Sequence, residues 1–412
     1  MKLKLILIML LFWTSIMEAQ SVIKTMFYNL LEFPEAPPSN RPTILKTILD
    51  DYQPDLFMVC ELQSEEGANT ILNTSLQTTS NNYDRANFVS NQSNPTTDLQ
   101  QLVFFNTEKL LLESQDEINT GVRDINHYLF KLNTPDKAIN PIYLDVFVAH
   151  LKSSQGFENE DLRLDMVLDF TSTLANIPSD HFVLISGDFN LYTGQEGAYQ
   201  ELLDPTNAIV LIDPIDKDGN WSNNSSYQDI HTQSSRTTNV DFGKRGAGGG
   251  MDDRFDFILI SENLKNSSML KYTPNSYKAY GNNGNCYDKA VNDINCTGTY
   301  SQAIRDALYN MSDHLPVVMQ LETDQTLSTK NPKLNANNIN FINGNLITDN
   351  IHLKADDSLL NFKIIIYDST GQQIETITLE KKITTINATN FANGIYYIKL
   401  QNSNSPLKFI KL

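Results

Sequence analysis

The stretch ISGDFN, residues 185–190, follows the apolar run HFVL and ends it abruptly in Gly-Asp-Phe-Asn. An apolar run of this kind is typical of a buried strand, whereas Gly, Asp and Asn are disfavoured inside strands. One interpretation is a strand that runs into a turn. The other is that Asp188 and Asn190 lie on one face at the end of a strand, because strand side chains alternate with a period of two.

Other apolar runs in the chain end or begin with polar side chains in the same way. They are FYN (Asn29), VCE (Glu61), VAH (His150), RFDF (Asp256) and SDHLPV (Asp313 and His314). One polar strand end is a turn, but six such sites are hard to explain as turns. Acidic, amide and imidazole groups crowd together where a divalent cation or a phosphate offsets their repulsion. The pattern therefore favours a functional site at the sheet edges.

Strand-like and helix-like segments alternate over the first three hundred residues. The strand candidates are residues 22–30, 55–62, 101–106, 144–151, 181–189, 255–261 and 316–321, and the helix candidates are residues 42–52, 67–76 and 158–177. Such alternation predicts an α/β domain with sheets inside and helices outside.

The composition changes near the C-terminus. Residues 324–338 are polar, contain a proline and lack an apolar period, which predicts a linker. Beyond it, short apolar segments are separated by turn signals such as STGQQ (369–373) and NFANG (390–394), which predict a small β-sandwich at residues 339–412. Apart from His352 and the pair Asp356–Asp357, this module has no His, Cys or carboxylate cluster in its sequence, so we expect it to do no chemistry.

Both parts of the chain resemble known families. The motifs FYN, CEL, GDFN, RFDF and SDHLPV occur in the order found in the endonuclease/exonuclease/phosphatase superfamily, which residues 22–321 resemble. This resemblance implies a four-layer sandwich of two packed mixed sheets flanked by helices, with a metal-dependent phosphoester hydrolase site across the sheet edges. The segments IIIYDSTGQQIETI, INATNFANGIYYIKL and KFIKL resemble a type IX secretion sorting domain, which implies that residues 339–412 direct export through the type IX machinery.

The N-terminus is consistent with export. Lys2 and Lys4 precede a short apolar stretch, and a small residue, Ala19, follows it, which predicts a signal peptide at residues 1–19. In an oxidising compartment, Cys286 and Cys296 are expected to form a local disulfide, whereas Cys60 lies in an apolar strand. We expect a secreted monomer, extracellular or on the outer cell surface, without stable membrane insertion.

The resemblance assigns roles to individual residues. The expected metal ligands are Asn29, Glu61 and Asp313; the expected catalytic residues are His150, Asp188, Asn190, Asp256 and His314; and the expected substrate-binding residues are Lys152, Arg236 and Arg254. Carboxylate and amide oxygens suit Mg²⁺, with Mn²⁺ or Ca²⁺ as alternatives. A carboxylate partner would fix the tautomer of His314, and Asp256 is preferred over the competing Asp253 for that role because it matches the spacing of the family motif. The division of labour between His150 and His314 stays open.

The substrate is the least determined feature. A histidine at position 150 resembles the branches with a histidine pair, which include secreted deoxyribonucleases, sphingomyelinases and some phosphatases. We predict a nuclease that acts on DNA more than RNA, although the net charge of −18 argues against a broad basic surface. The alternatives are a secreted phosphatase, a lipid phosphodiesterase and a non-catalytic binding protein on this fold. The aromatic and basic segment 220–250 predicts either a phosphate-binding groove or a glycine-rich surface loop.

Overall fold

The structure is a computed structural model that describes residues 21–76, 82–327, 339–342, 344–355, 359–360, 362–400 and 406–412. The chain divides into two compact units, residues 1–328 and 329–412, and the division falls inside the predicted linker. The predicted signal peptide, residues 1–19, and residues 328–338 of the linker lie outside the described residues. Within the described ranges, no helix is both long enough and apolar enough to cross a membrane.

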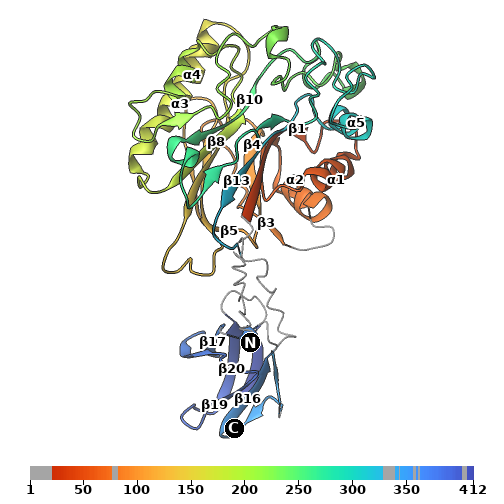
Figure 1. The fold of residues 1–412 in the computed structure, drawn as a ribbon. Helices are drawn as coiled ribbons and strands as arrows, with labels where there is room; N and C mark the ends of the chain where they lie inside the picture. Colours follow the sequence, from red (N-terminus) through yellow and green to blue (C-terminus); the bar gives the residue numbers. More distant parts are fainter. Residues whose placement is uncertain are drawn as a thin grey trace, which may run out of the picture. The chain divides into compact units, whose positions relative to one another are not determined.

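Two mixed β-sheets form the centre of the first unit (Figure 1). The strands of the first sheet are β1 (Ser21–Phe33), β2 (Leu56–Leu62), β3 (Tyr83–Arg85), β4 (Gln100–Asn106), β11 (Lys271–Tyr272), β12 (Lys278–Ala279) and β13 (Val317–Thr323). Their order is β11-β13-β1-β2-β4-β3, and β12 also pairs with β13. The second sheet contains β5 (Leu110–Ile118), β6 (Ile125–Leu132), β7 (Tyr143–His150), β8 (Phe182–Asp188), β9 (Leu211–Ile212) and β10 (Asp256–Ser261), in the order β5-β6-β7-β8-β10-β9.

Helices cover the outer faces of the two sheets (Figure 1). The helices α1 (Arg41–Tyr52), α2 (Glu65–Thr70), η1 (Ile71–Leu76) and α5 (Gln302–Met311) gather on one side. The helices α3 (Phe157–Thr173), η2 (Leu174–Asn176) and α4 (Gly197–Leu202) gather on the other. The short helices η3 (Ser225–Tyr227), η4 (Val240–Phe242) and η5 (Glu262–Lys265) lie in connections. The predicted four-layer α/β sandwich is confirmed.

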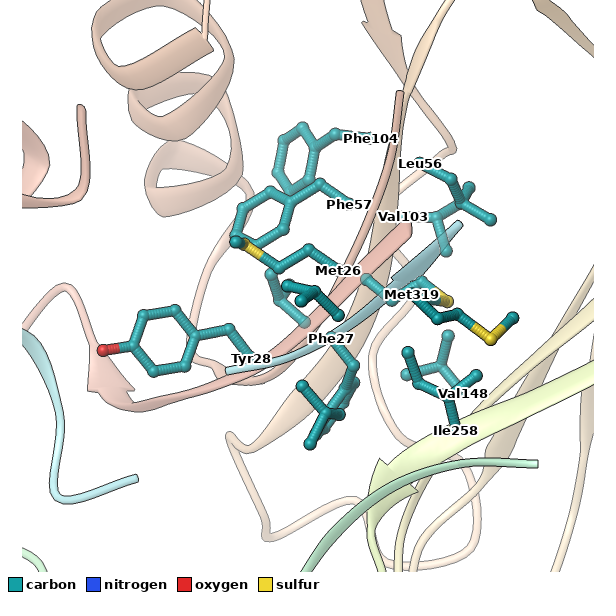
Figure 2. Packing of buried hydrophobic residues seen from close by; sticks show 14 of the residues in the cluster. Met26, Phe27, Tyr28, Leu56, Phe57, Val103, Phe104, Val148, Ile258 and Met319 are labelled. Carbon is teal, nitrogen blue, oxygen red and sulfur yellow. The ribbon is translucent and has the colours of Figure 1, made fainter. Parts of the chain in front are cut away.

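Strand alternation explains why the second sheet is buried on both faces. Val148 of β7 and Ile258 of β10 pack with Met319 of β13 in the cluster between the sheets (Figure 2). Their neighbours along the strands, Phe147 and Phe257, belong instead to the cluster that includes residues of α3 and α4. Successive residues therefore point to opposite faces, and this period also fixes which strand-end side chains face the first sheet.

The cysteines are arranged as the sequence predicts. Cys286 and Cys296 form a disulfide that closes a loop between β12 and α5. Cys60 of β2 is a free, buried thiol, as expected for a small apolar side chain in a central strand.

The second unit consists of two small β-sheets. Its strands are β14 (Ile339–Phe341), β15 (Leu346–Ile347), β16 (Asn350–Ala355), β17 (Lys363–Asp368), β18 (Gln373–Thr378), β19 (Ile383–Asn387), β20 (Gly394–Leu400) and β21 (Leu407–Lys411). The sheets have the orders β14-β16-β19 and β15-β21-β20-β17-β18. Ile351, Ile366, Ile398 and Phe409 share a buried cluster. The predicted all-β module is confirmed, and its core is separate from that of the first unit.

The first unit is expected to fold without the second when the chain is truncated after Leu327. The Leu327 side chain is buried in the core of the first unit, and its N–H donates to the Ser21 hydroxyl. Truncation after Thr323 should lower the free energy of unfolding by about 1.5–3 kcal/mol relative to truncation after Leu327, because it deletes this apolar side chain. Denaturant unfolding of the two truncated proteins measures the difference. Equal stability of the two would show that Leu327 does not contribute to the core.

Candidate functional site

Three strands of the second sheet end in polar side chains on the face toward the first sheet. His150 lies two residues after Val148, and Asp256 lies two residues before Ile258, so both share the inner face. Asp188 of β8 lies opposite His150 of the parallel strand β7 and opposite Asp256 of the antiparallel strand β10. All three of these polar residues are at most 3% exposed. Sheet register alone therefore brings an imidazole and two carboxylates together.

The first sheet adds Asn29 and Glu61. The pairing of β1 with β2 becomes irregular after Asn29, and Glu61 has a φ of 57°, so its side chain departs from the regular alternation. The Asn29 Nδ2 group donates to Glu61 Oε1 at 2.9 Å and to Asp188 Oδ2 at 3.0 Å, which links the two sheets. Its Oδ1 accepts the Leu31 N–H at 2.9 Å. In this orientation Asn29 is a donor to carboxylates, and the ligand role predicted for it stays a prediction.

Glu61, His150 and Asp188 form a compact set of possible metal ligands. One ligand atom from each lies within 4.8 Å of the others. His150 Nε2 is 3.9 Å from Glu61 Oε1 and 3.6 Å from Asp188 Oδ2, and its buried Nδ1 has no hydrogen-bond partner among the described residues. Two carboxylates and an imidazole are a donor set that suits a divalent cation. Unlike the set predicted from sequence, this one contains His150 and Asp188.

Asp313 is held by segments that precede it by more than sixty residues. Its Oδ2 accepts the Ala247 N–H at 2.6 Å and the Gln233 side-chain amide at 3.3 Å. Gly246 packs so closely that a Cβ there would lie 2.8 Å from Asp313 Cγ. Asp313 Oδ1 is buried and has no partner among the residues described. Gly246 and Ala247 of the glycine-rich segment thus position Asp313, a predicted metal ligand. The sequence did not indicate this role for the segment.

His314 is backed by Asp256. His314 Nδ1 lies 2.8 Å from Asp256 Oδ2, and both residues are buried. On the other side of the ring, His314 Nε2 lies 2.6 Å from the Gln233 side-chain nitrogen and 3.7 Å from Asp188 Oδ2. Asp253, the competing candidate, does not make the contact with His314 Nδ1. The geometry therefore matches the partner that the motif spacing favours.

Burial and mutual repulsion set the protonation of the cluster. Burial, together with the Asp256 and Glu61 carboxylates, raises the pKa of Asp188 to about 7 although His314 opposes the shift. Burial also raises the pKa of Glu61. Burial lowers the pKa of His150 well below its ordinary value. Burial alone would lower the pKa of His314, but Asp256 and Asp188 outweigh it and hold the pKa well above its ordinary value. These shifts favour the neutral form of His150 and the charged form of His314, and the charged form requires that the Gln233 amide turn its oxygen toward His314 Nε2.

Two loops next to these strands carry other predicted residues. Asn190 has a φ of 51°, and its N–H donates to Asp188 Oδ1 at 3.1 Å, so it lies beside the cluster. The Lys152 ammonium group donates to the Ser153 carbonyl at 2.8 Å. Its predicted contact with substrate stays a prediction.

A buried ion pair holds these two loops, and sequence analysis missed it. Arg163 of α3 donates to Glu196 Oε2 through Nε at 2.8 Å and through Nη2 at 2.6 Å. Arg163 Nη1 also donates to the carbonyls of Lys152 and Ser154, both at 2.9 Å. Glu196 Oε1 accepts the Tyr192 N–H at 2.7 Å. The pair therefore ties the loop after β7 to the loop after β8.

Arg123 is a second residue that sequence analysis missed. Its Nε donates to the His150 carbonyl at 2.8 Å, and a second nitrogen contacts the Leu151 carbonyl. Its positive charge acts on Asp188 and Glu61, and the side chain is partly exposed. The residue lies in a loop between β5 and β6, where no apolar run ends, so the strand-end pattern could not have found it.

The structure does not bring Arg236 and Arg254 to the cluster. Arg254 is fully buried and pairs with Asp213 at 2.8 and 3.1 Å. Arg236 is also fully buried; its Nε donates to the Tyr309 carbonyl, and its guanidinium stacks on Phe242. Side chains without exposed surface do not reach a ligand, so the predicted substrate contacts of these two arginines have no support here.

Comparison with solved structures finds similar proteins at low sequence identity. D. rerio TDP2 complexed with a single-strand DNA product has a TM-score of 0.48 and 12% identity, over 74% of this chain and 100% of that chain. The human Nocturnin catalytic domain with bound sulfate has a TM-score of 0.45 and 16% identity, over 73% and 97%. A mannosyl-6-phosphatase of Bacteroides thetaiotaomicron has a TM-score of 0.44 and 14% identity, over 73% and 99%. These likenesses do not by themselves assign an activity.

Comparison of sequences identifies the C-terminal module. No curated protein gives a significant match to the chain. Residues 345–411 match the family described as the secretion system C-terminal sorting domain. The resemblance of this module to a secretion sorting domain is thereby confirmed, and it indicates that the protein is secreted or displayed on the cell surface.

Proposed function

We propose that this protein is a secreted, metal-dependent phosphoester hydrolase of the endonuclease/exonuclease/phosphatase type that acts as an extracellular nuclease, on DNA more than on RNA. The observation that carries the proposal is the convergence of Glu61, His150 and Asp188 from both sheets, next to the pair of His314 and Asp256. The sorting-domain match supports export. The motif order that resembles this superfamily supports the reaction class.

The donor set supports a divalent cation at this site. Glu61 is the anionic ligand of the first sheet, and His150 and Asp188 complete the group on the second. Asp313 is proposed in a supporting role, directly or through water. Mg²⁺ is the predicted ion, Mn²⁺ suits the imidazole better, and Ca²⁺ is a further candidate. A cation bound there would polarise a phosphoryl oxygen and offset the charge that develops in the transition state.

The remaining groups suit proton transfer and orientation. Without a metal the pKa of Asp188 is raised to about 7, and a bound cation would lower it, so Asp188 is proposed to orient the attacking water or to accept its proton in the ionised form. Asp256 fixes the His314 ring, so its Nε2 points toward Asp188, where the charged imidazole can donate to a phosphoryl oxygen. Contact of His150 with the leaving-group side is the alternative to its role as a ligand, and Asn190 is proposed to hold a phosphate oxygen through its amide.

A phosphatase for small phosphoesters is the second candidate, and the placement of the arginines favours it. Arg236 and Arg254 are buried, and Arg245 pairs with Glu32 and lies 3.7 Å from Glu35. Carboxylates pair with Arg245 and Arg254, and Arg236 is buried although its Nη atoms lack partners among the described residues, so the three offer little to a polynucleotide backbone, whose binding depends on many phosphate contacts.

A substrate panel tests the proposed function. The wild-type protein is assayed on DNA, RNA, sphingomyelin and p-nitrophenyl phosphate, each with Mg²⁺, Mn²⁺ or Ca²⁺. We expect DNA cleavage with Mg²⁺ or Mn²⁺, its loss in excess chelator, and loss of most activity in Glu61→Gln. The matched control is Glu201→Gln, because the Glu201 carboxylate contacts Thr171 on the outer helices. Full activity in chelator would overturn the metal-dependent mechanism, whereas hydrolysis of p-nitrophenyl phosphate alone would select the phosphatase.

The histidine partner can be tested by two neighbouring substitutions. Asp256→Asn should lower kcat on the order of a hundredfold, as should His314→Ala, because both remove the oriented, charged imidazole. Asp253→Asn should have a mild effect, since its side chain does not contact His314 Nδ1. Residues that act as one unit are non-additive, so the Asp256→Asn/His314→Ala double variant should be only slightly worse than the poorer single one. If Asp253→Asn were the damaging change, the assignment of the partner would be wrong.

A further inference from the structure

A cavity of about 410 Å³ is formed by the segments that follow β7 and β8 in the chain. Its lining includes Gln155 and Glu160 from the first segment and Tyr192, Thr193 and Gln195 from the second. The catalytic side chains of β7 and β8 lie at the ends of the same strands. The cavity is therefore built on the two connections closest in sequence to the proposed reaction centre.

Tyr192 connects the cavity to the catalytic cluster. It follows Asp188 by four residues and lines the cavity. Burial, with the charges of Asp253 and Asp188, raises the pKa of Tyr192 to about 12, so this phenol is neutral and lies within the electrostatic reach of the cluster. Its ring packs edge-on against Phe255, with centroids 4.9 Å apart. Tyr192 thus places one wall of the cavity on the segment that leads away from the cluster.

The cavity has walls that are already held in place. The pair of Arg163 and Glu196 joins both segments, and Glu196 also fixes the Tyr192 backbone. The Thr193 hydroxyl donates to the Gly219 carbonyl at 3.3 Å. These contacts hold the backbone of both segments before any ligand binds, whereas the exposed side chains of Gln155 and Gln195 would lose rotamer freedom on binding.

The lining suits a neutral, hydroxylated ring. None of the described residues hydrogen-bonds to the side-chain amides of Gln155 and Gln195, so both are free to bind hydroxyl groups. Tyr192 offers an aromatic ring, which can pack against the C–H groups of a sugar. The described lining residues include the carboxylates of Glu160 and Glu196 and no cation. A second phosphate would face the carboxylate of Glu160, whereas Arg163 neutralises that of Glu196, and an acyl chain would leave the amides unpaired.

We propose that this cavity binds the sugar ring that carries the scissile phosphoester. The inference rests on the proposed function, because it names the organic group next to the phosphate that the cluster would hydrolyse. The ring could be the pentose of a nucleotide or the hexose of a sugar phosphate, which present the same chemistry of hydroxyl groups on a C–H framework. Gln155 and Gln195 are the residues that select for it.

Binding of uncharged probes tests the cavity without metal or turnover. Thymidine and methyl glucopyranoside are titrated into the full-length protein in chelator by calorimetry or by ligand-observed NMR. We expect one of them to bind and the Gln155→Ala/Gln195→Ala variant to weaken its binding about thirtyfold, since two hydrogen bonds of about 1 kcal/mol each are lost. Both residues are exposed, so the fold should be retained. Gln372→Ala, at an exposed glutamine of the second unit, is the matched control.

Kinetics separate this proposal from the proposed function. The nitrophenyl ester of thymidine 5′-phosphate and the sugar-free bis(p-nitrophenyl) phosphate are compared in wild type and double variant. We expect kcat/KM to fall about thirtyfold for the sugar-bearing ester, through KM, and to stay within about twofold for the other. Equal losses on both esters, or no binding of either probe, would overturn the sugar site. Binding of a probe by a protein that hydrolyses no phosphoester would overturn the proposed function and leave the sugar site standing.

Discussion

The Asn29 side-chain amide, which donates to Glu61 from one sheet and to Asp188 from the other, is the contact on which the site depends. It joins two carboxylates that would otherwise repel each other where the sheets meet. The surrounding groups add to this repulsion, because Asp256 and Asp313 are also buried. Burial of ionisable carboxylates is costly unless they are paired or coordinate a metal. The cluster is therefore destabilising for the fold in the absence of a cation.

The two sheets make this arrangement possible by simple periodicity. His150 lies two positions after Val148 and Asp256 two positions before Ile258, both of which fill the core between the sheets, and Asp188 lies four positions after the core residue Leu184 of β8. The polar side chains of the site therefore lie on the same strand faces as the apolar side chains of the core. The connections after β7 and β8 are held by Arg163 and Glu196, so they add side chains to the site from fixed positions.

Much of this arrangement could be predicted from sequence, since polar strand ends and α/β alternation are local patterns. The β5–β6 hairpin could not, because most of β5 is polar and only Leu110 in it is buried. Arg163 and Glu196 are 33 residues apart, and no local pattern links them. The motif predicts that Arg254 binds substrate. Arg254 precedes β10, so strand alternation does not determine where its side chain points, and in the structure the side chain pairs with Asp213.

Thermal unfolding with and without metal tests the central claim, that the cluster is an anionic site built for a cation. The pKa of Asp188 is about 7 in the folded protein against an ordinary 3.8. Without metal, the contribution of Asp188 to stability therefore falls as pH rises from about 4 through 7, and Asp188→Asn separates it from the opposite contribution of His150. In chelator, Asp188→Asn should raise Tm on the order of 5 °C at pH 8 and less at pH 5. Mn²⁺ or Mg²⁺ should raise the Tm of wild type and have little effect on Glu61→Gln or Asp188→Asn. The account would be contradicted if the Tm of wild type did not change when Mn²⁺ or Mg²⁺ is added and the Tm of Asp188→Asn in chelator were lower than that of wild type.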